Sequence, residues 1–525
     1  MGKLYAAVLS ALLLAHNASA LDPIIMKGTK FFYTNGTQFF MKGIAYQQDT
    51  AAAGGESVTG EYKDPLADEA ACKRDVPILV KAGTNTIRTY AIDPKNDHSA
   101  CMGLLSDAGI YVVSDLSEPK LSINRETPQW NTELYDRYTS VIDALAKYDN
   151  TIGFFAGNEV SNDKKNTEAS AFVKAAVRDA KKHIKEKGYR WMGVGYAAND
   201  DKDIRVNSAH YFNCGDQAAA IDFWGYNIYS WCGENTLVGA GFDKQIDFFR
   251  NYSVPVFFAE YGCNKPDGGN SRIFQETTAL YEKEMTDVFS GGIVYMFHQE
   301  ANDFGLVEIK NGQAKTMRNY DQLASRVLAA NPTAIQMDSY EPSNSPAECP
   351  STASNWEVHG DTLPPTPDKD LCECMVKSLS CVPKSDLKAK AIGDIFGFVC
   401  GASADFCEGI NTEPSTGVYG AFSMCSDEQK LAYVMNDYYK AQKSARAACD
   451  YDGQGEVVSP SADDTCKKAL TSVTPPGSST AKPSSSSSGN AAAGSPYQPV
   501  FSFGGFAVGA YLIASGCVGA AIMVL

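Results

Sequence analysis

The feature that most constrains the fold is a long alternation of short apolar runs with helix-like stretches. Runs rich in β-branched and aromatic residues occupy residues 39–47, 84–92, 111–117, 151–160, 190–198, 221–231, 254–262 and 291–300. Strands that alternate with helices indicate parallel βαβ units. Eight such units fit a closed (β/α)8 barrel, or TIM barrel, so we expect an α/β fold of this kind.

The stretches between these runs have the period of amphipathic helices. In the clearest one, a helical face is shared by Val173, Val177, Ala180 and Ile184, and Gly188 ends the helix. Residues 135–148 and 274–289 have similar patterns. We therefore predict helices between the strands.

The alternative fold is an open doubly wound sheet. That fold usually places a Gly-rich phosphate turn after its first strand. Here the first strand ends in Tyr46-Gln47-Gln48 instead, which favours the barrel.

The ends of the predicted strands carry carboxylates, amides and tyrosines. In a barrel of this type the functional site lies at the C-terminal ends of the strands. In chain order these ends carry Tyr46 and Gln47, Arg88 and Tyr90, Asp115, Asn158 and Glu159, Asn199 and Asp200, Tyr226 and Tyr229, Glu260 and Tyr261, and Tyr295 with Glu300. Carboxylates can act on a glycosidic bond and aromatic faces can stack on a sugar ring, so the site suits a carbohydrate.

Two glutamates are placed to face each other across such a site. A glycosidase needs one carboxyl to protonate the leaving oxygen and a second, ionised carboxyl to attack the anomeric carbon or activate water. Glu159 and Glu260 end the fourth and seventh strands, nearly across the barrel. Either one alone could be a salt-bridged or solvated residue, and the tyrosines could be core packing. Asp115 and Arg88 could form an internal charge network that orients the glutamates.

Charge and cysteine content exclude other classes of function. The formal net charge is −16, which argues against a nucleic-acid partner. Six cysteines fall in the first long segment and eight in the second, as expected for disulfides in an oxidising compartment. The Cys372-Glu373-Cys374 spacing does not suit zinc, and we predict no metal and no cofactor. The cysteines are Cys72, Cys101, Cys214, Cys232, Cys263 and Cys349, then Cys372, Cys374, Cys381, Cys400, Cys407, Cys425, Cys449 and Cys466.

Both ends of the chain resemble processing signals. Residues 1–20 have a short apolar run and end in Ala18-Ser19-Ala20, which indicates a secretory signal peptide rather than a membrane anchor. At the other end, small residues, a polar spacer and an apolar tail without a charged stop indicate a glycosylphosphatidylinositol signal. We expect attachment at Asn490, with Gly489 and Gly494 as alternatives. A transmembrane helix is the competing interpretation of the tail.

Composition divides the chain into parts. We predict a signal peptide at 1–20, the barrel at 21–340, a Pro-rich stiff linker at 341–370, a Cys-rich module at 371–467, a Ser-rich tether at 468–490 and an anchor propeptide at 491–525. The module is expected to be small, disulfide-rich and mainly helical. Asn35 and Asn251 begin glycosylation sequons.

The motifs resemble a known family. GFFAGNEV, which contains Asn158-Glu159, and PVFFAEYGCN, which contains Glu260, are similar to motifs of fungal β-1,3-glucanosyltransferases of glycoside hydrolase family 72. RTYAID at 88–93 fits the same family. CECM at 372–375 and GVYGAFSMCS at 417–426 resemble the Cys-rich carbohydrate-binding module of family 43.

The resemblance implies roles for individual residues. Glu159 would be the general acid/base and Glu260 the nucleophile, while Asn158 would contact the sugar 2-hydroxyl. Further substrate contacts would come from Gln47, Tyr90, Asp115, Asp200, Arg205, Tyr229 and Tyr295. It also implies disulfides that pair Cys72 with Cys101, Cys214 with Cys349, and Cys232 with Cys263.

The implied activity is transfer of one β-1,3-glucan chain onto another, with retention of configuration. Donor and acceptor glucans would be the partners of a monomeric enzyme, secreted and anchored to the outer face of the plasma membrane or released into the wall. A retaining β-1,3-glucan hydrolase is the first alternative, and a non-catalytic glucan-binding protein of the wall is the second. The Cys-rich module would bind glucan or brace the barrel.

Overall fold

The computed structural model describes residues 21–48 and 62–473. Eight parallel strands form a closed barrel in the order β10-β11-β4-β5-β6-β7-β8-β9. The strands are β4 (Met41–Ala45), β5 (Thr86–Thr89), β6 (Tyr111–Asp115), β7 (Thr151–Asn158), β8 (Gly193–Ala198), β9 (Trp224–Asn227), β10 (Val256–Tyr261) and β11 (Phe289–Val294). Each one falls within or overlaps one of the eight predicted runs, so the prediction of an α/β TIM barrel is confirmed.

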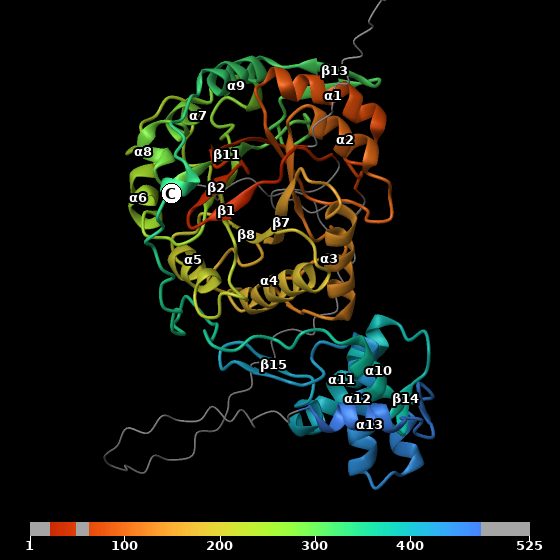
Figure 1. Cartoon of the computed structure of the whole chain (residues 1–525). Helices are drawn as coiled ribbons and strands as arrows, with labels where there is room; N and C mark the ends of the chain where they lie inside the picture. Colours follow the sequence, from red (N-terminus) through yellow and green to blue (C-terminus); the bar gives the residue numbers. More distant parts are fainter. Residues whose placement is uncertain (1–20, 49–61, 474–525) are drawn as a thin grey trace, which may run out of the picture.

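Helices cover the outside of the barrel (Figure 1). They are α1 (Glu69–Lys81), α2 (Ser99–Asp107), α3 (Thr132–Leu145), α4 (Ala169–Glu186), α5 (Arg205–Asn213), α6 (Phe242–Phe249), α7 (Gln275–Leu280), α8 (Lys283–Thr286) and α9 (Arg318–Ala329). The predicted face of α4 is buried, and the chain leaves the helix at Gly188 with a left-handed φ of 68°. The prediction of one helix over 274–289 was wrong, because two short helices precede β11, which begins at Phe289.

A small sheet closes the end of the barrel opposite the strand C-termini. It consists of β1 (Ile25–Lys27), β2 (Lys30–Phe32) and β3 (Gln38–Phe39). The Phe31 ring lies 6.2 Å from the rings of both Phe223 and Phe257, which fill the barrel interior. The site at the other end therefore stands on a packed aromatic core. A hairpin of β12 (Val307–Lys310) and β13 (Gln313–Thr316) and the short 3-10 helices η1 (Gly269–Ser271) and η2 (Met337–Ser339) complete this part.

The C-terminal part is a separate, mainly helical unit that lies beside α3 and α4 (Figure 1). Its core sits between α11 and α12. Its elements are α10 (Lys369–Lys377), β14 (Cys381–Pro383), α11 (Ala389–Ala402), η3 (Ala404–Cys407), β15 (Thr412–Glu413), β16 (Val418–Tyr419), α12 (Asp427–Ala441), η4 (Arg446–Cys449), β17 (Gly455–Val457) and α13 (Asp464–Thr471).

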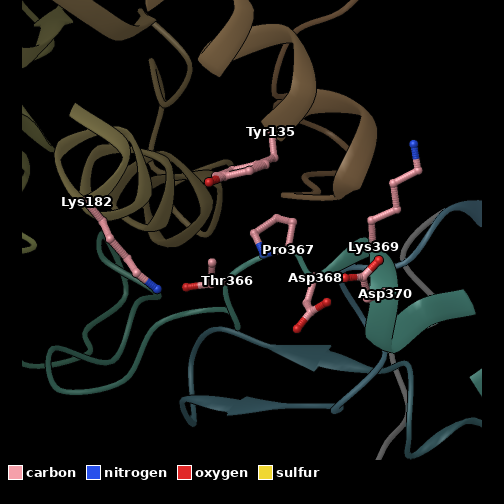
Figure 2. A pocket seen from close by; sticks show the side chains of 7 residues that line it. All are labelled: Tyr135, Lys182, Thr366, Pro367, Asp368, Lys369 and Asp370. Atoms are coloured by element: carbon pink, nitrogen blue, oxygen red, sulfur yellow. The ribbon is translucent and has the colours of Figure 1, made fainter. Parts of the chain in front are cut away.

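The segment predicted as a stiff linker is folded onto the barrel. Trp356 and Val358 are fully buried, and the Trp356 ring lies 5.3 Å from that of Tyr211. The Thr366 hydroxyl donates to Asp179 of α4 over 2.7 Å. Next to it, a cavity of about 360 Å³ opens between the two parts (Figure 2) and is lined by Tyr135, Lys182, Thr366, Pro367, Asp368, Lys369 and Asp370.

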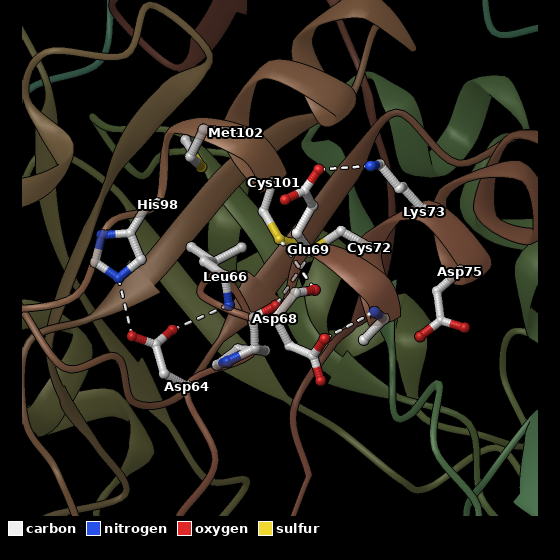
Figure 3. The surroundings of a disulfide bond; sticks show 12 residues. Asp64, Leu66, Asp68, Glu69, Cys72, Lys73, Asp75, His98, Cys101 and Met102 are labelled. Atoms are coloured by element: carbon white, nitrogen blue, oxygen red, sulfur yellow. Dashed lines mark hydrogen bonds and ion pairs between the residues drawn. A yellow bond between two sulfur atoms is a disulfide. The ribbon is translucent and has the colours of Figure 1, made fainter. Parts of the chain in front are cut away.

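Seven disulfides cross-link the described residues. The barrel pairs are Cys72–Cys101, Cys214–Cys349 and Cys232–Cys263, which are the pairs that the resemblance implies. The module pairs are Cys372–Cys425, Cys374–Cys466, Cys381–Cys449 and Cys400–Cys407. Figure 3 shows the first pair, which joins α1 to α2 beside the hydrogen bond between His98 and Asp64.

Some predictions concern residues outside the described ranges. The signal peptide at 1–20, most of the Ser-rich tether and the anchor signal with Asn490 all lie there. Within residues 21–48 and 62–473, no helix combines the length and apolar character that a bilayer crossing requires. The sequon residues Asn35 and Asn251 are described, and both are exposed.

Candidate active site

The two predicted glutamates lie at the C-terminal ends of β7 and β10. Glu260 belongs to β10 and is fully buried. Glu159 directly follows β7, is partly exposed, and has a left-handed φ of 50°. Its backbone is held on both sides, since its N–H donates to Ala197 O over 2.8 Å and its carbonyl accepts from Arg125 Nη2 over 2.9 Å. A non-glycine residue in this conformation is costly and is a recurrent feature of functional sites.

Three donors hold the Glu260 carboxyl. Tyr90 donates to Oε1 over 2.9 Å and Tyr229 donates to Oε2 over 2.8 Å. Arg88 Nη1 lies 3.4 Å from Oε1. Burial raises the pKa of Glu260 to about 7, the Arg88 charge acts to lower it, and the nearby Glu159 charge raises it. The carboxylate is therefore fixed in direction, and it senses the charge of the opposite glutamate.

Arg88 connects these groups beneath the site. It is fully buried and makes two 3.0 Å hydrogen bonds to the Asp115 carboxylate. Its Nη2 also donates to Asn158 Oδ1 over 3.1 Å. The guanidinium carbon lies 4.3 Å from the Tyr90 ring centroid and 4.4 Å from that of Phe155. Asp115 thus balances the arginine charge from below, as the charge-network alternative for these two residues suggested.

The Asn158 side chain is oriented by two donors. Its Oδ1 accepts from Arg88 Nη2 and, over 3.0 Å, from Asn227 Nδ2. Because both donors reach the oxygen, the Asn158 NH2 group is turned away from them. Asn227 Nδ2 also donates to Glu159 Oε1 over 2.8 Å. Asn227 lies opposite Glu260 in the ladder between β9 and β10, so both glutamates are neighbours of Asn227.

Four aromatic rings form a connected cluster at the site, and two of them, Tyr90 and Tyr229, bond the Glu260 carboxyl. Tyr90 and Tyr295 meet edge to face at 6.2 Å. Phe304 packs edge to face on Tyr295 at 5.3 Å and on Tyr229 at 5.7 Å. Tyr295 directly follows β11, which ends at Val294, whereas the sequence suggested a strand that contains it. Tyr295 is fully buried and Tyr90 nearly so, whereas Tyr229 and Phe304 are partly exposed. The last two rings therefore offer apolar faces next to charged groups, which is the combination a sugar requires.

The remaining predicted contacts are engaged with other parts of the chain. The Gln47 side-chain oxygen accepts from the backbone N–H groups of Tyr90 and Ala91, and its Nε2 donates to Lys63 O. Gln47 thus fixes the backbone that carries Tyr90. Asp200 and Arg205 pair over 2.7 Å just after β8, and Tyr226 also hydrogen-bonds to Asp200.

Sequence reasoning missed two residues of this site. Alternate residues of a strand point to opposite faces. Gly225, Asn227 and Tyr229 are spaced two residues apart, so Asn227 is expected to point inward together with the other two. That alternation could have found it. Phe304 lies in the connection between β11 and β12, where no strand pattern marks it. Among the residues that the structure describes, no group of three or more His, Cys, Asp or Glu side chains is placed to hold a metal ion.

Comparison with known families decides the classification. The profile described as "Glucanosyltransferase" matches residues 13–331, and the X8 domain profile matches residues 379–456. The chain belongs to the glucanosyltransferase family. The barrel and its site can therefore be compared with those of known members of the family.

Similar relatives extend over most of the chain. A protein from Arthroderma benhamiae named 1,3-beta-glucanosyltransferase is 53% identical over 454 residues, which is 83% of each chain. The Schizosaccharomyces pombe protein 1,3-beta-glucanosyltransferase gas1 is 42% identical over 462 residues, 87% of this chain and 82% of that one. A solved structure of Saccharomyces cerevisiae Gas2p, a mutant in complex with laminaritetraose and laminaripentaose, has a TM-score of 0.77 and 40% identity. It covers 86% of this chain and 98% of the Gas2p chain.

Proposed function

We propose that this chain is a 1,3-β-glucanosyltransferase. It cleaves an internal linkage of a β-1,3-glucan and transfers the new reducing end to the non-reducing end of a second β-1,3-glucan. The observation that carries this proposal is a buried carboxyl, Glu260, held by Arg88, Tyr90 and Tyr229 and influenced by the charge of Glu159. Relatives named for this activity, and a similar structure solved with laminari-oligosaccharides, support the same substrate class.

The first half of the reaction forms a glycosyl-enzyme. The Glu260 carboxylate attacks the anomeric carbon of an internal glucose as the bond from that carbon to the departing oxygen breaks. Glu159 gives its proton to this oxygen. Arg88 and the two tyrosine hydroxyls fix the direction of the attacking oxygens. Asn158, whose NH2 is turned away from Arg88, donates to the 2-hydroxyl of the reacting sugar.

The second half consumes the glycosyl-enzyme. A hydroxyl of the acceptor glucan loses its proton to Glu159 while its oxygen bonds to the anomeric carbon and Glu260 leaves. Two displacements at one carbon give net retention. Tyr90, Tyr229 and Tyr295 line the groove, and Asp200 with Arg205 contact sugar at its edge. Transfer prevails over hydrolysis where the acceptor subsite holds a sugar in preference to water.

The size of the products tests the activity. A reduced laminari-oligosaccharide of one length is incubated with the enzyme, and the products are separated by size over time. Products longer than the starting sugar demonstrate transfer. Shorter products alone would instead assign a retaining hydrolase, and binding without any product would assign a wall-binding protein.

A matched pair of variants tests the nucleophile. Glu260→Gln removes the attacking charge with little change of shape, so turnover is expected to fall at least about 1,000-fold while oligosaccharide binding remains. Glu276→Gln is the control, because Glu276 is also a buried glutamate, on α7, whose pKa burial raises to about 7. Equal activity of the two variants would contradict the assignment of Glu260.

The location of the enzyme is part of the proposal. Seven disulfides support folding in an oxidising compartment. We expect a secreted monomer that a glycolipid anchor at Asn490 holds on the outer face of the plasma membrane. Mass spectrometry of the C-terminal peptide tests this attachment, and a peptide that continues unmodified to Leu525 would contradict it.

A further inference from the structure

The amide of Asn227 touches the side chains of both residues at the end of β7. Asn227 ends β9 and is 3% exposed. Its Nδ2 donates to Glu159 Oε1 over 2.8 Å and to Asn158 Oδ1 over 3.0 Å. The Asn227 NH2 group therefore donates one N–H to each of these two neighbouring side chains.

The chemistry of its neighbours fixes the orientation of this amide. A flipped amide would place the Asn227 oxygen against Glu159 Oε1 and Asn158 Oδ1. All three oxygens are acceptors, so they would repel one another. In the observed orientation, Asn227 Oδ1 is buried and has no hydrogen-bond partner within the described part of the chain. A buried acceptor without a partner costs free energy, so stability alone does not account for an asparagine at this position.

The Glu159 backbone is fixed independently of its carboxyl. Hydrogen bonds to Ala197 O and from Arg125 Nη2 hold the peptide groups on either side of its α-carbon. The side chain can still rotate about its own bonds, and rotation would exchange the two carboxyl oxygens. The hydrogen bond from Asn227 to Oε1 opposes that exchange.

We propose that Asn227 is a positioning residue that directs the proton of Glu159 toward the glycosidic oxygen. This rests on the proposed role of Glu159 as general acid/base. Because an N–H donor occupies Oε1, the proton of the acid form resides on Oε2, the oxygen that is free to meet the substrate. Asn227 acts through Glu159 and needs no contact with the sugar.

The reaction balances with this single proton. In the first step the proton on Oε2 passes to the departing oxygen as its bond to the anomeric carbon breaks, and Glu260 forms the new bond. In the second step the acceptor hydroxyl returns a proton to Oε2 as its oxygen displaces Glu260. The Asn227 N–H stays on Oε1 throughout, so Oε2 remains the oxygen that exchanges the proton in both steps.

Donors with different leaving groups test the proposal. A laminari-oligosaccharide needs a proton on its departing oxygen, whereas a dinitrophenyl β-glycoside of the same oligosaccharide releases a stable anion without one. Asn227→Ala is expected to lower kcat/KM for the oligosaccharide about 10- to 100-fold. For the dinitrophenyl donor, the rate of the dinitrophenolate burst should change less than about 3-fold.

A second variant and a matched control complete the experiment. Asn227→Asp keeps the shape but replaces the N–H donor by a charged acceptor, so it should show the same dependence on the leaving group with a larger loss. Asn213→Ala is the control, because Asn213 is 1% exposed and ends α5, where it bonds Ser253 and neither glutamate. Asn213→Ala should leave unchanged the ratio of kcat/KM for the oligosaccharide to the burst rate for the dinitrophenyl donor.

The outcomes separate the inference from the function on which it rests. Glu159→Gln is measured alongside and should show the strongest dependence on the leaving group. If both Asn227 variants slow the two donors equally while Glu159→Gln shows that dependence, the positioning role is overturned and the proposed function stands. If Glu159→Gln slows both donors equally, the acid/base assignment itself fails.

Discussion

At the scale of single residues, contacts of the site converge on Arg88. This buried side chain reaches Asp115, Asn158 and Glu260, and it lies between two aromatic rings. A buried charge is tolerated only when opposite charges and hydrogen bonds compensate for lost water. Arg88 and Asp115 therefore depend on each other, and their loss should affect stability as well as activity.

Removal of Arg88 tests this dependence. Arg88→Met leaves Asp115 as an unpaired buried carboxylate, so the free energy of unfolding should fall by about 3–5 kcal/mol. Arg88→Met combined with Asp115→Leu removes both charges and should recover at least half of that loss. Urea denaturation measures both values. A double variant no more stable than Arg88→Met would show that the pair is not the source of the loss.

The pH dependence of the first chemical step should reflect Glu260. Its carboxyl must be ionised to attack, so activity is present above its pKa of about 7 and lost as the pH falls through it. The Tyr229 hydroxyl favours the ionised form by donating to Oε2. Tyr229→Phe should therefore raise the pKa and move the acidic limb of kcat/KM about one unit to higher pH.

The control for this shift is another buried tyrosine. Tyr252→Phe also removes one hydroxyl, which bonds Ala209 O between α5 and α6 rather than a carboxylate. The acidic limb of the kcat/KM profile of Tyr252→Phe should coincide with that of the unchanged enzyme. A limb that moves equally in both variants would assign the titration to a group other than Glu260.

At the scale of elements, glycines make room for the aromatic core of the barrel. A Cβ on Gly225 of β9 would lie 2.6 Å from the Phe155 ring and 2.8 Å from Ala259 Cβ. Phe155 itself packs on Phe223 and Phe257. The barrel interior is therefore filled by large rings set against small residues, and neither can change size alone.

Two identical substitutions should have opposite effects on stability. Gly225→Ala overfills the barrel and should lower the free energy of unfolding by about 1–3 kcal/mol. Gly103→Ala, in α2, meets no atom within 4 Å and should raise it by about 0.5–1 kcal/mol, since alanine favours helix. Thermal unfolding measures both. Destabilisation by Gly103→Ala would contradict the helical environment assigned to it.

The sequence predicts elements better than it predicts side-chain networks. All eight barrel strands were expected from runs such as 151–160, because periodicity and β-branched content act locally. The helix break before Phe289 was not expected, since apolar residues continue across it. Phe304 was missed because its role arises from neighbours on other strands and loops, whereas Asn227 could have been found from the alternation along β9. Both glutamates were identified from their positions at strand ends and from the motifs that surround them.

At the scale of the whole molecule, the module is attached firmly to the barrel. The Tyr419 ring lies 6.3 Å from that of Phe172 on α4. Lys430 Nζ of α12 donates to Gln129 Oε1 over 2.9 Å, and the N–H of Thr132, at the start of α3, donates to Met424 O over 3.0 Å. These contacts support bracing of the barrel as a role of the module, because the Tyr419 contact reaches α4, the helix that follows Glu159 in the chain.

The Cys214–Cys349 disulfide fastens the connecting segment and spans 135 residues. In the chain-entropy view, a cross-link stabilises more when it closes a longer loop in the unfolded chain. Cys214→Ser with Cys349→Ser should lower the free energy of unfolding by about 5 kcal/mol. Cys72→Ser with Cys101→Ser, which opens a loop of 29 residues in the same barrel, should cost about 3.5 kcal/mol.

Limited proteolysis distinguishes fastening of the segment from a general loss of stability. Without Cys214–Cys349, residues 341–355 are held on the barrel mainly by hydrogen bonds such as those from Asn344 to Arg250 O and Tyr252 O, so this stretch should be cleaved before the barrel unfolds. The Cys72→Ser/Cys101→Ser variant should resist cleavage there, because its segment is still fastened. Equal cleavage in both variants, together with equal losses of unfolding free energy, would contradict a special role for the longer cross-link.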